Sequence, residues 1–137
     1  CVLYPGVADM LQALRRAGVV LCTATSKPVT VVTPILQELG IAEYFHFIGG
    51  ASEDSSIDTK TAVIRDLLPR EFLQGKKILM VGDRRDDMEG ARDCGLPAAA
   101  VAYGYGSKEE LAPYQPLILA NSCNELTNFI LEGDSNE

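Results

Sequence analysis

The sequence predicts an α/β protein in which helices cover both faces of a mostly parallel sheet. Short apolar runs of strand length alternate with stretches of helical periodicity along the chain. Such alternation is typical of right-handed βαβ units. Three of the candidate helices also end just before a glycine, at Gly18, Gly40 and Gly95, which is a common helix terminator.

The individual elements follow from these patterns. Apolar spacing predicts helices over 7–17, 31–39, 59–68 and 86–94, the second of them opening at Lys27-Pro28. Continuous apolar runs predict strands over 19–25, 77–81 and 97–104, with weaker candidates at 46–51 and 117–120. The first strand reads as one that is buried on both faces. Together the elements predict a three-layer α/β/α architecture.

The chain reads as one domain, residues 1–130, followed by a polar tail over 131–137. Its 137 residues are enough to bury a core. It opens with Cys1 and shows no signal-peptide pattern. We therefore expect a piece cut from a longer protein.

Composition excludes two classes of partner. A net charge of −7 argues against nucleic acid, whose phosphates need clustered Lys and Arg. No apolar run reaches the roughly 18 residues of a membrane span. The four cysteines are widely spaced, and Cys22 and Cys94 lie in apolar or helical patterns typical of reduced, buried thiols. We expect a cytoplasmic protein.

Candidate site residues follow two of the predicted strands. In parallel sheets ligands bind beyond the carboxyl ends of the strands. Thr25 and Ser26, at the start of a helix, offer hydroxyls and N–H groups for a phosphate. Asp83 and Asp87 lie one turn apart and could share a Mg²⁺ ion. Each signal alone also fits ordinary helix capping.

The series of motifs resembles the haloacid dehalogenase superfamily. T-S-K-P at 25–28, the isolated Lys60 and V-G-D-R-R-D-D at 81–87 are similar to its second, third and fourth motifs. Y-P-G-V at 4–7, and V-A-Y-G-Y-G at 101–106 followed by E-E-L, resemble the phosphoglycolate phosphatase branch. The resemblance covers essentially the whole chain and implies a Rossmann-like core.

The resemblance implies Mg²⁺-dependent hydrolysis of a small phosphorylated metabolite, such as phosphoglycolate, through an aspartyl-phosphate. Thr25 would donate its hydroxyl to the phosphoryl group, with the Ser26 amide helping. Lys60 would neutralise phosphate charge and hold the nucleophile. Asp83 would bind Mg²⁺, and Asp87 would complete or orient that shell.

The nucleophile of this family is missing from the sequence. It is the first aspartate of a D-x-D-G-[ST] motif, which occurs nowhere here, and the cap that follows it is also absent. We expect the isolated chain to be inactive. The nucleophile strand of the family lies between the strands at 19–25 and 77–81. Its absence predicts one of three solutions: direct pairing of those strands, a strand lent by a second copy, or an upstream segment.

Other interpretations stay open. The chain could be a non-catalytic phosphate- or metal-binding remnant with a regulatory or assembly role. A receiver domain like those of response regulators is more distant, with Asp83 as its acceptor. His46 is expected to be a strand-edge or a packed residue rather than a catalytic base. Arg84 and Arg85 are expected on a solvated face, paired with Asp86 and Glu89. Tyr103 and Tyr105 are expected in an exposed turn.

Overall fold

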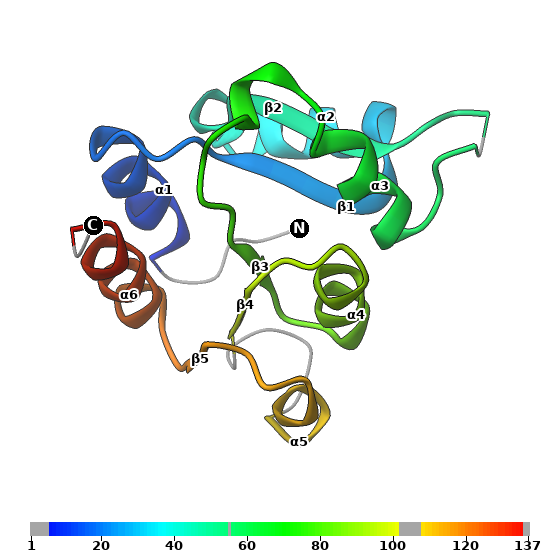
Figure 1. The fold of residues 1–137 in the computed structure, drawn as a ribbon. Helices are drawn as coiled ribbons and strands as arrows, with labels where there is room; N and C mark the ends of the chain where they lie inside the picture. Colours follow the sequence, from blue (N-terminus) through cyan, green and yellow to red (C-terminus); the bar gives the residue numbers. More distant parts are fainter. Residues whose placement is uncertain (1–5, 55, 102–107, 136–137) are drawn as a thin grey trace.

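The computed structural model describes residues 6–54, 56–101 and 108–135, in which strands and helices alternate (Figure 1). The α-helices are α1 (Val7–Arg16), α2 (Val29–Glu38), α3 (Lys60–Leu67), α4 (Arg85–Asp93), α5 (Lys108–Leu111) and α6 (Cys123–Ser135). The strands are β1 (Cys22–Pro28), β2 (Phe47–Ala51), β3 (Met80–Gly82), β4 (Ala98–Val101) and β5 (Ile118–Ala120). Three short 3₁₀ turns connect them: η1 (Ala42–Tyr44), η2 (Glu71–Leu73) and η3 (Ala112–Tyr114).

The strands form two separate parallel sheets. One has the order β1-β2 and the other the order β3-β4-β5. Figure 1 shows the two sheets on either side of the centre of the molecule. Within the described residues β1 pairs with β2 alone and β3 with β4 alone. Direct pairing of β1 with β3, the first of the three expected solutions, was therefore wrong, and the other two stay predictions.

Helices cover both faces of each sheet, as expected for three layers. In β2, Ile48 packs in the cluster that contains Leu36 of α2, whereas the next residue, Gly49, lies against Leu67 of α3. Successive strand residues point to opposite faces, so α2 and α3 lie on different sides. The second sheet repeats the pattern.

In that second sheet, the central strand β4 carries the alternation. Ala99 and Val101 pack with Leu126 of α6, and Ala100 packs with Met88 of α4. Leu11 of α1 packs with Leu36 of α2, and α1 also contacts α6, so these three helices form one outer layer. Helix α4 contacts both α3 and α5, which form the other layer with it. The predicted three-layer α/β/α fold is confirmed.

Two strand boundaries differ from the prediction. The strand expected over 19–25 runs instead from Cys22 to Pro28, because its ladder with β2 begins where Cys22 faces Phe47. Its residues are half-buried or exposed rather than fully buried. The strand expected over 77–81 is limited to Met80–Gly82, the residues that face Ala98–Ala100 of β4. Hydrogen-bonded partners, rather than apolar content, set both boundaries.

Helix α6 was not predicted. Its start is capped reciprocally: Glu125 N donates to Ser122 Oγ at 3.1 Å, and Asn121 N donates to Glu125 Oε2 at 3.1 Å. Ser followed three residues later by Glu is the sequence signature of a capping box, and here the Glu125 carboxylate accepts from the residue before Ser122. The helix reaches Ser135, so much of the expected polar tail is helical. Part of the strand expected over 97–104, residues 102–104, lies outside the described residues.

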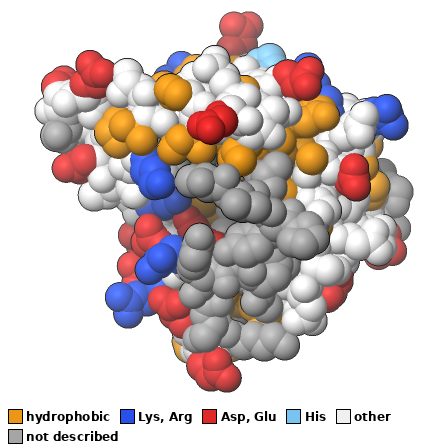
Figure 2. All heavy atoms as spheres, turned by 180° about the vertical axis from the view of Figure 1, so that it is seen from behind, with side chains coloured by type: hydrophobic (Ala, Val, Ile, Leu, Met, Phe, Trp, Pro, Cys, Tyr) orange, Lys and Arg blue, Asp and Glu red, His pale blue; other side chains and the backbone are white. Residues whose placement is uncertain are grey.

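Charged side chains of both signs mix on the surface. Figure 2 shows Lys and Arg interspersed with Asp and Glu along one flank of the face that it presents. Arg84 and Arg85 are exposed, as expected, and Arg85 Nε lies 3.7 Å from Glu89 Oε1. Among the helices described, none has the length and apolar content to cross a bilayer.

Candidate active site at the ends of β1 and β3

Lys60 joins the two sheets. It is the first residue of α3, whose N-cap Thr59 accepts a hydrogen bond from Ala62 N at 3.1 Å. The Lys60 ammonium donates to Ala24 O of β1 at 2.8 Å, and it lies 2.6 Å from Oδ1 of Asp87 in α4. Only 13% of the Lys60 side chain and 9% of the Asp87 side chain are exposed. A shielded cation therefore lies where β1 and the β3–α4 connection meet.

Asp87 anchors the loop that follows β3. Its Oδ2 accepts hydrogen bonds from Asp83 N at 3.1 Å and from Arg84 N at 3.3 Å, while Oδ1 faces Lys60. A Cβ at Gly82 would collide with the Asp87 side chain. Both carboxylate oxygens thus have protein donors, and these contacts suit the orienting role that the sequence suggested.

Asp83 follows β3 directly and is half-buried. Its backbone N–H is held by Asp87, so the position of its peptide depends on the Lys60–Asp87 pair. Asp83, Lys60 and Asp87 are therefore brought together, as expected from the sequence.

Thr25 and Ser26 lie inside β1, so the expectation that they start a helix was wrong. Helix α2 begins at Val29, with Pro28 as its N-cap. The β1–β2 ladder pairs Ala24 with Gly49 and next Pro28 with Ala51, which leaves three β1 residues opposite one β2 residue. Such a bulge takes backbone groups out of the ladder.

The bulge gives this segment local hydrogen bonds. Lys27 N donates to Thr25 Oγ1 at 3.2 Å, so the Thr25 hydroxyl accepts one bond and keeps its own hydrogen to donate to a ligand. Ser26 is exposed on the same segment. Since Lys60 holds the carbonyl of Ala24, the residue before Thr25, this segment is tied to the Asp83 loop.

The donor set suits a metal ion that is shared with a phosphate. Within the described ranges no group of three or more His, Cys, Asp or Glu residues is arranged to hold a metal. Mg²⁺ commonly keeps several waters and uses one or two carboxylates together with phosphate oxygens. Asp83, an oxygen donor at the end of β3, fits that kind of site.

His46 and Cys22 are two further side chains of types that can carry chemistry. His46 is exposed and stands directly before β2, at the strand edge that was expected, with its ring 4.5 Å from that of Phe72. Cys22 is half-buried, and burial raises the pKa of its thiol. Tyr103 and Tyr105 lie outside the described residues.

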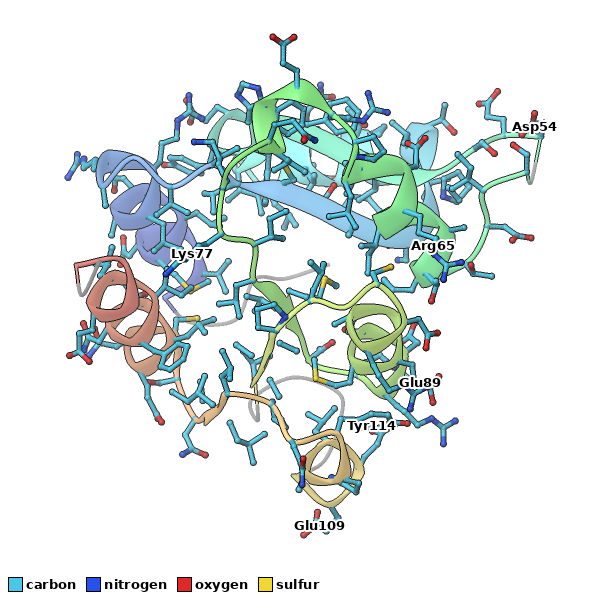
Figure 3. The ribbon with its side chains drawn as sticks, viewed as in Figure 1. Asp54, Arg65, Lys77, Glu89, Glu109 and Tyr114 are labelled. Carbon is cyan, nitrogen blue, oxygen red and sulfur yellow. The ribbon has the colours of Figure 1, made fainter. Side chains whose placement is uncertain are left out.

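Tyr114 and Glu89 form a polar contact that the sequence did not suggest. Tyr114 Oη donates to Glu89 Oε1 at 2.7 Å, and Figure 3 shows the two side chains where α4 and the segment after α5 approach each other. That hydrogen bond is the main cause of a raised pKa for Tyr114.

One hollow in the described part of the chain lies away from these residues. A cavity of about 220 Å³ lies beside α4, at the start of β4 and along η3, and its lining includes none of Thr25, Lys60 and Asp83. Its walls combine polar groups of Arg92, Tyr114 and Gln115 with apolar side chains, which are those of Met88, Ala91, Leu96, Pro97, Ala98 and Leu117. Charge and donor geometry, which phosphoryl chemistry requires, favour the ends of β1 and β3 instead.

Comparisons with known proteins show which family the chain resembles. The haloacid dehalogenase-like hydrolase family matches residues 1–95. The chain is 34% identical over 125 residues to the phosphoglycolate phosphatase of Salmonella typhimurium, covering 91% of this chain and 50% of that protein. It is 32% identical over 129 residues to the phosphoglycolate phosphatase of Vibrio vulnificus, covering 94% and 57%.

A solved structure extends the likeness to the fold. The crystal structure of a predicted phosphatase from Clostridium acetobutylicum matches with a TM-score of 0.88 at 38% identity, over 94% of this chain and 60% of that one. The chain thus spans about half the length of the curated relatives it matches.

Proposed function

The chain belongs to the haloacid dehalogenase-like hydrolase family, and we propose that it forms the phosphoryl-binding part of a Mg²⁺-dependent phosphatase. The observation that supports this most is the Lys60 ammonium, shielded from solvent and lying between Ala24 O and the Asp87 carboxylate. The substrate we propose is a small phosphomonoester similar to phosphoglycolate, because the relatives named above are phosphoglycolate phosphatases.

The residues divide the work of phosphoryl transfer, which depends mainly on positioning and charge stabilisation. Thr25 donates its hydroxyl hydrogen to a phosphate oxygen, with the Ser26 N–H beside it. Lys60 neutralises negative charge on the phosphoryl group. Asp83 holds Mg²⁺, which supplies further charge neutralisation when bound. Asp87 keeps Lys60 and the Asp83 loop in place.

The nucleophile comes from outside this sequence in our proposal. The chain contains no D-x-D-G-[ST] motif, and β1 and β3 are not paired with each other in the described residues. We propose that an additional strand carrying the nucleophilic aspartate lies between them, from an upstream segment or from a second copy. The chain alone is then inactive. A cytosolic location accords with the reduced thiols of Cys22 and Cys94.

Hydrolysis of p-nitrophenyl phosphate with and without Mg²⁺ tests this proposal. Three proteins are compared: this chain, a version extended upstream by a strand with the aspartate motif, and the extended version with Asp83→Asn. We expect Mg²⁺-dependent hydrolysis by the second alone. Hydrolysis by the short chain would show that the nucleophile lies within it. No hydrolysis by a folded extended chain would favour a non-catalytic phosphate- or metal-binding role.

A further inference from the structure

We infer that Gly90 is a positioning residue for the Lys60 ammonium. The inference rests on the proposed role of Lys60 in phosphate binding. The packing of Gly90 against Lys60 is observed in the structure and does not depend on that role. Gly90 is buried in the middle of α4, where α4 packs against the first turn of α3. Its missing side chain leaves the space through which the Lys60 side chain passes.

The Lys60 side chain leaves little space at Gly90. A Cβ at Gly90 would lie 2.9 Å from Lys60 Cγ and 3.0 Å from Ile64 Cδ1. The Lys60 Cγ atom is near the backbone of its residue, so it cannot move without redirecting the rest of the side chain. Since that side chain is buried along α4, an added methyl group displaces it instead of deflecting a mobile end.

Nothing in the backbone of α4 requires glycine at this position. Gly90 is not among the described glycines with positive φ. A glycine inside a helix is less favourable than alanine because it loses more conformational freedom on folding. The close approach of Lys60 and Ile64 is therefore the reason that the structure gives for a glycine here.

Displacement of Lys60 affects both the Thr25 segment of β1 and the Asp83 loop after β3. Its ammonium is within hydrogen-bonding distance of Ala24 O, at 2.8 Å, and Asp87 Oδ1, at 2.6 Å, from a single side-chain conformation. Ala24 precedes Thr25, and Asp87 holds the N–H of Asp83. A shift of the lysine stem breaks one of these contacts, so Gly90 sets the alignment of Thr25 with Asp83.

The side-chain ammonium resonance of Lys60 in ¹⁵N-labelled chain tests this without any need for activity. Loss of the signal in Lys60→Met assigns it. We expect it to shift or disappear in Gly90→Ala and to stay perturbed in Gly90→Ala/Ile64→Val, which removes the Ile64 contact alone. An unchanged resonance in Gly90→Ala would overturn the inference. So would its restoration by Ile64→Val, because Ile64 would then be what constrains position 90.

A thermal-unfolding cycle covers the case in which Gly90→Ala does not fold. The substitution is made in the wild-type chain and in Lys60→Ala/Asp87→Asn, where the lysine stem is gone and no lone carboxylate is left. We expect the second background to tolerate alanine with little change in Tm. An equal loss of Tm in both backgrounds would overturn the inference. Neither readout depends on phosphatase activity, so failure of the proposed function is measured separately, by the hydrolysis assay.

Discussion

The Lys60 ammonium and the Asp87 carboxylate are 2.6 Å apart, in a pair that solvent barely reaches. Lys60 also bonds to Ala24 O in β1, and Asp87 also bonds to the backbone after β3. The two sheets share no ladder in the described residues. The pair therefore connects them at the end where the candidate site lies, in addition to the packing of α3 against α4 (Figure 1).

Lys60→Met should destabilise the chain by about 3–5 kcal/mol, because it leaves the Asp87 carboxylate buried without its cation. Urea unfolding, followed by circular dichroism, measures the free energy of unfolding. Lys60→Met/Asp87→Leu should recover most of the loss, since both charges are then removed. A double variant as unstable as the single one would show that the unpaired carboxylate is not the cause.

Thr59→Ala should cost about 1 kcal/mol of stability through loss of the α3 cap. The Thr59 hydroxyl accepts the hydrogen bond of Ala62 N at 3.1 Å. Thr30→Ala, an exposed position of α2, is the matched control and should change stability by less than about 0.5 kcal/mol. Equal effects of the two substitutions in urea unfolding would contradict the capping role.

Asp54 should titrate far below an ordinary aspartate. Hydrogen bonds from Ser52 and Ser56 lower the pKa of Asp54 to about 2. A depressed pKa in the folded state contributes stability that is present above the unfolded value, about 3.9, and is lost as the pH falls toward 2. Carbon NMR of the Asp54 carboxyl group measures the titration directly.

Ser52→Ala provides the control for that titration. The Ser52 hydroxyl donates to Asp54 Oδ1 at 2.7 Å and is the largest cause of the shift. Its removal should raise the pKa of Asp54 toward the ordinary value. An Asp54 that titrates normally in the wild-type chain would show that this loop does not hold its hydrogen bonds in solution.

Glu89→Gln should lower the pKa of Tyr114, because the hydrogen bond to the Glu89 carboxylate is the main cause of its raised value. A raised pKa contributes stability that is present below the unfolded value, about 10, and is lost as the pH rises above it. Ultraviolet difference titration against Tyr114→Phe isolates this tyrosine. Equal pKa values of Tyr114 in wild type and in Glu89→Gln would show that this hydrogen bond does not form in solution.

Local sequence patterns predicted helices α1 to α4 well and the edges of the strands poorly. The helix expected over 59–68 is α3, Lys60–Leu67, because a capping threonine and apolar spacing define it locally. β1, in contrast, begins three residues later than its apolar run and continues through a bulge. Its ladder depends on β2, which lies more than twenty residues away in the sequence, so no local pattern could give the boundary.

The candidate site likewise contains residues that sequence motifs could predict and a contact that they could not. Lys60, Asp83 and Asp87 could be predicted from motif order, and the structure brings them together. The close packing of Gly90 on Lys60 could not, since α3 and α4 meet only in the fold. Helix α6 could have been found, because Ser122 and Glu125 have the spacing of a capping box in the sequence, and both side chains accept backbone hydrogen bonds at the helix start.

The most direct test of the account is kcat/KM for p-nitrophenyl phosphate in the extended chain with Thr25→Val, beside Thr30→Val as a control at an exposed position. Thr25 accepts only the local bond from Lys27 N among its described contacts, so its loss should leave the fold intact. We predict a decrease of about 10²–10³-fold, as for loss of one donor to a transition-state oxygen, and no change for Thr30→Val. A folded Thr25→Val protein with wild-type kcat/KM would contradict the placement of the phosphoryl site at the end of β1.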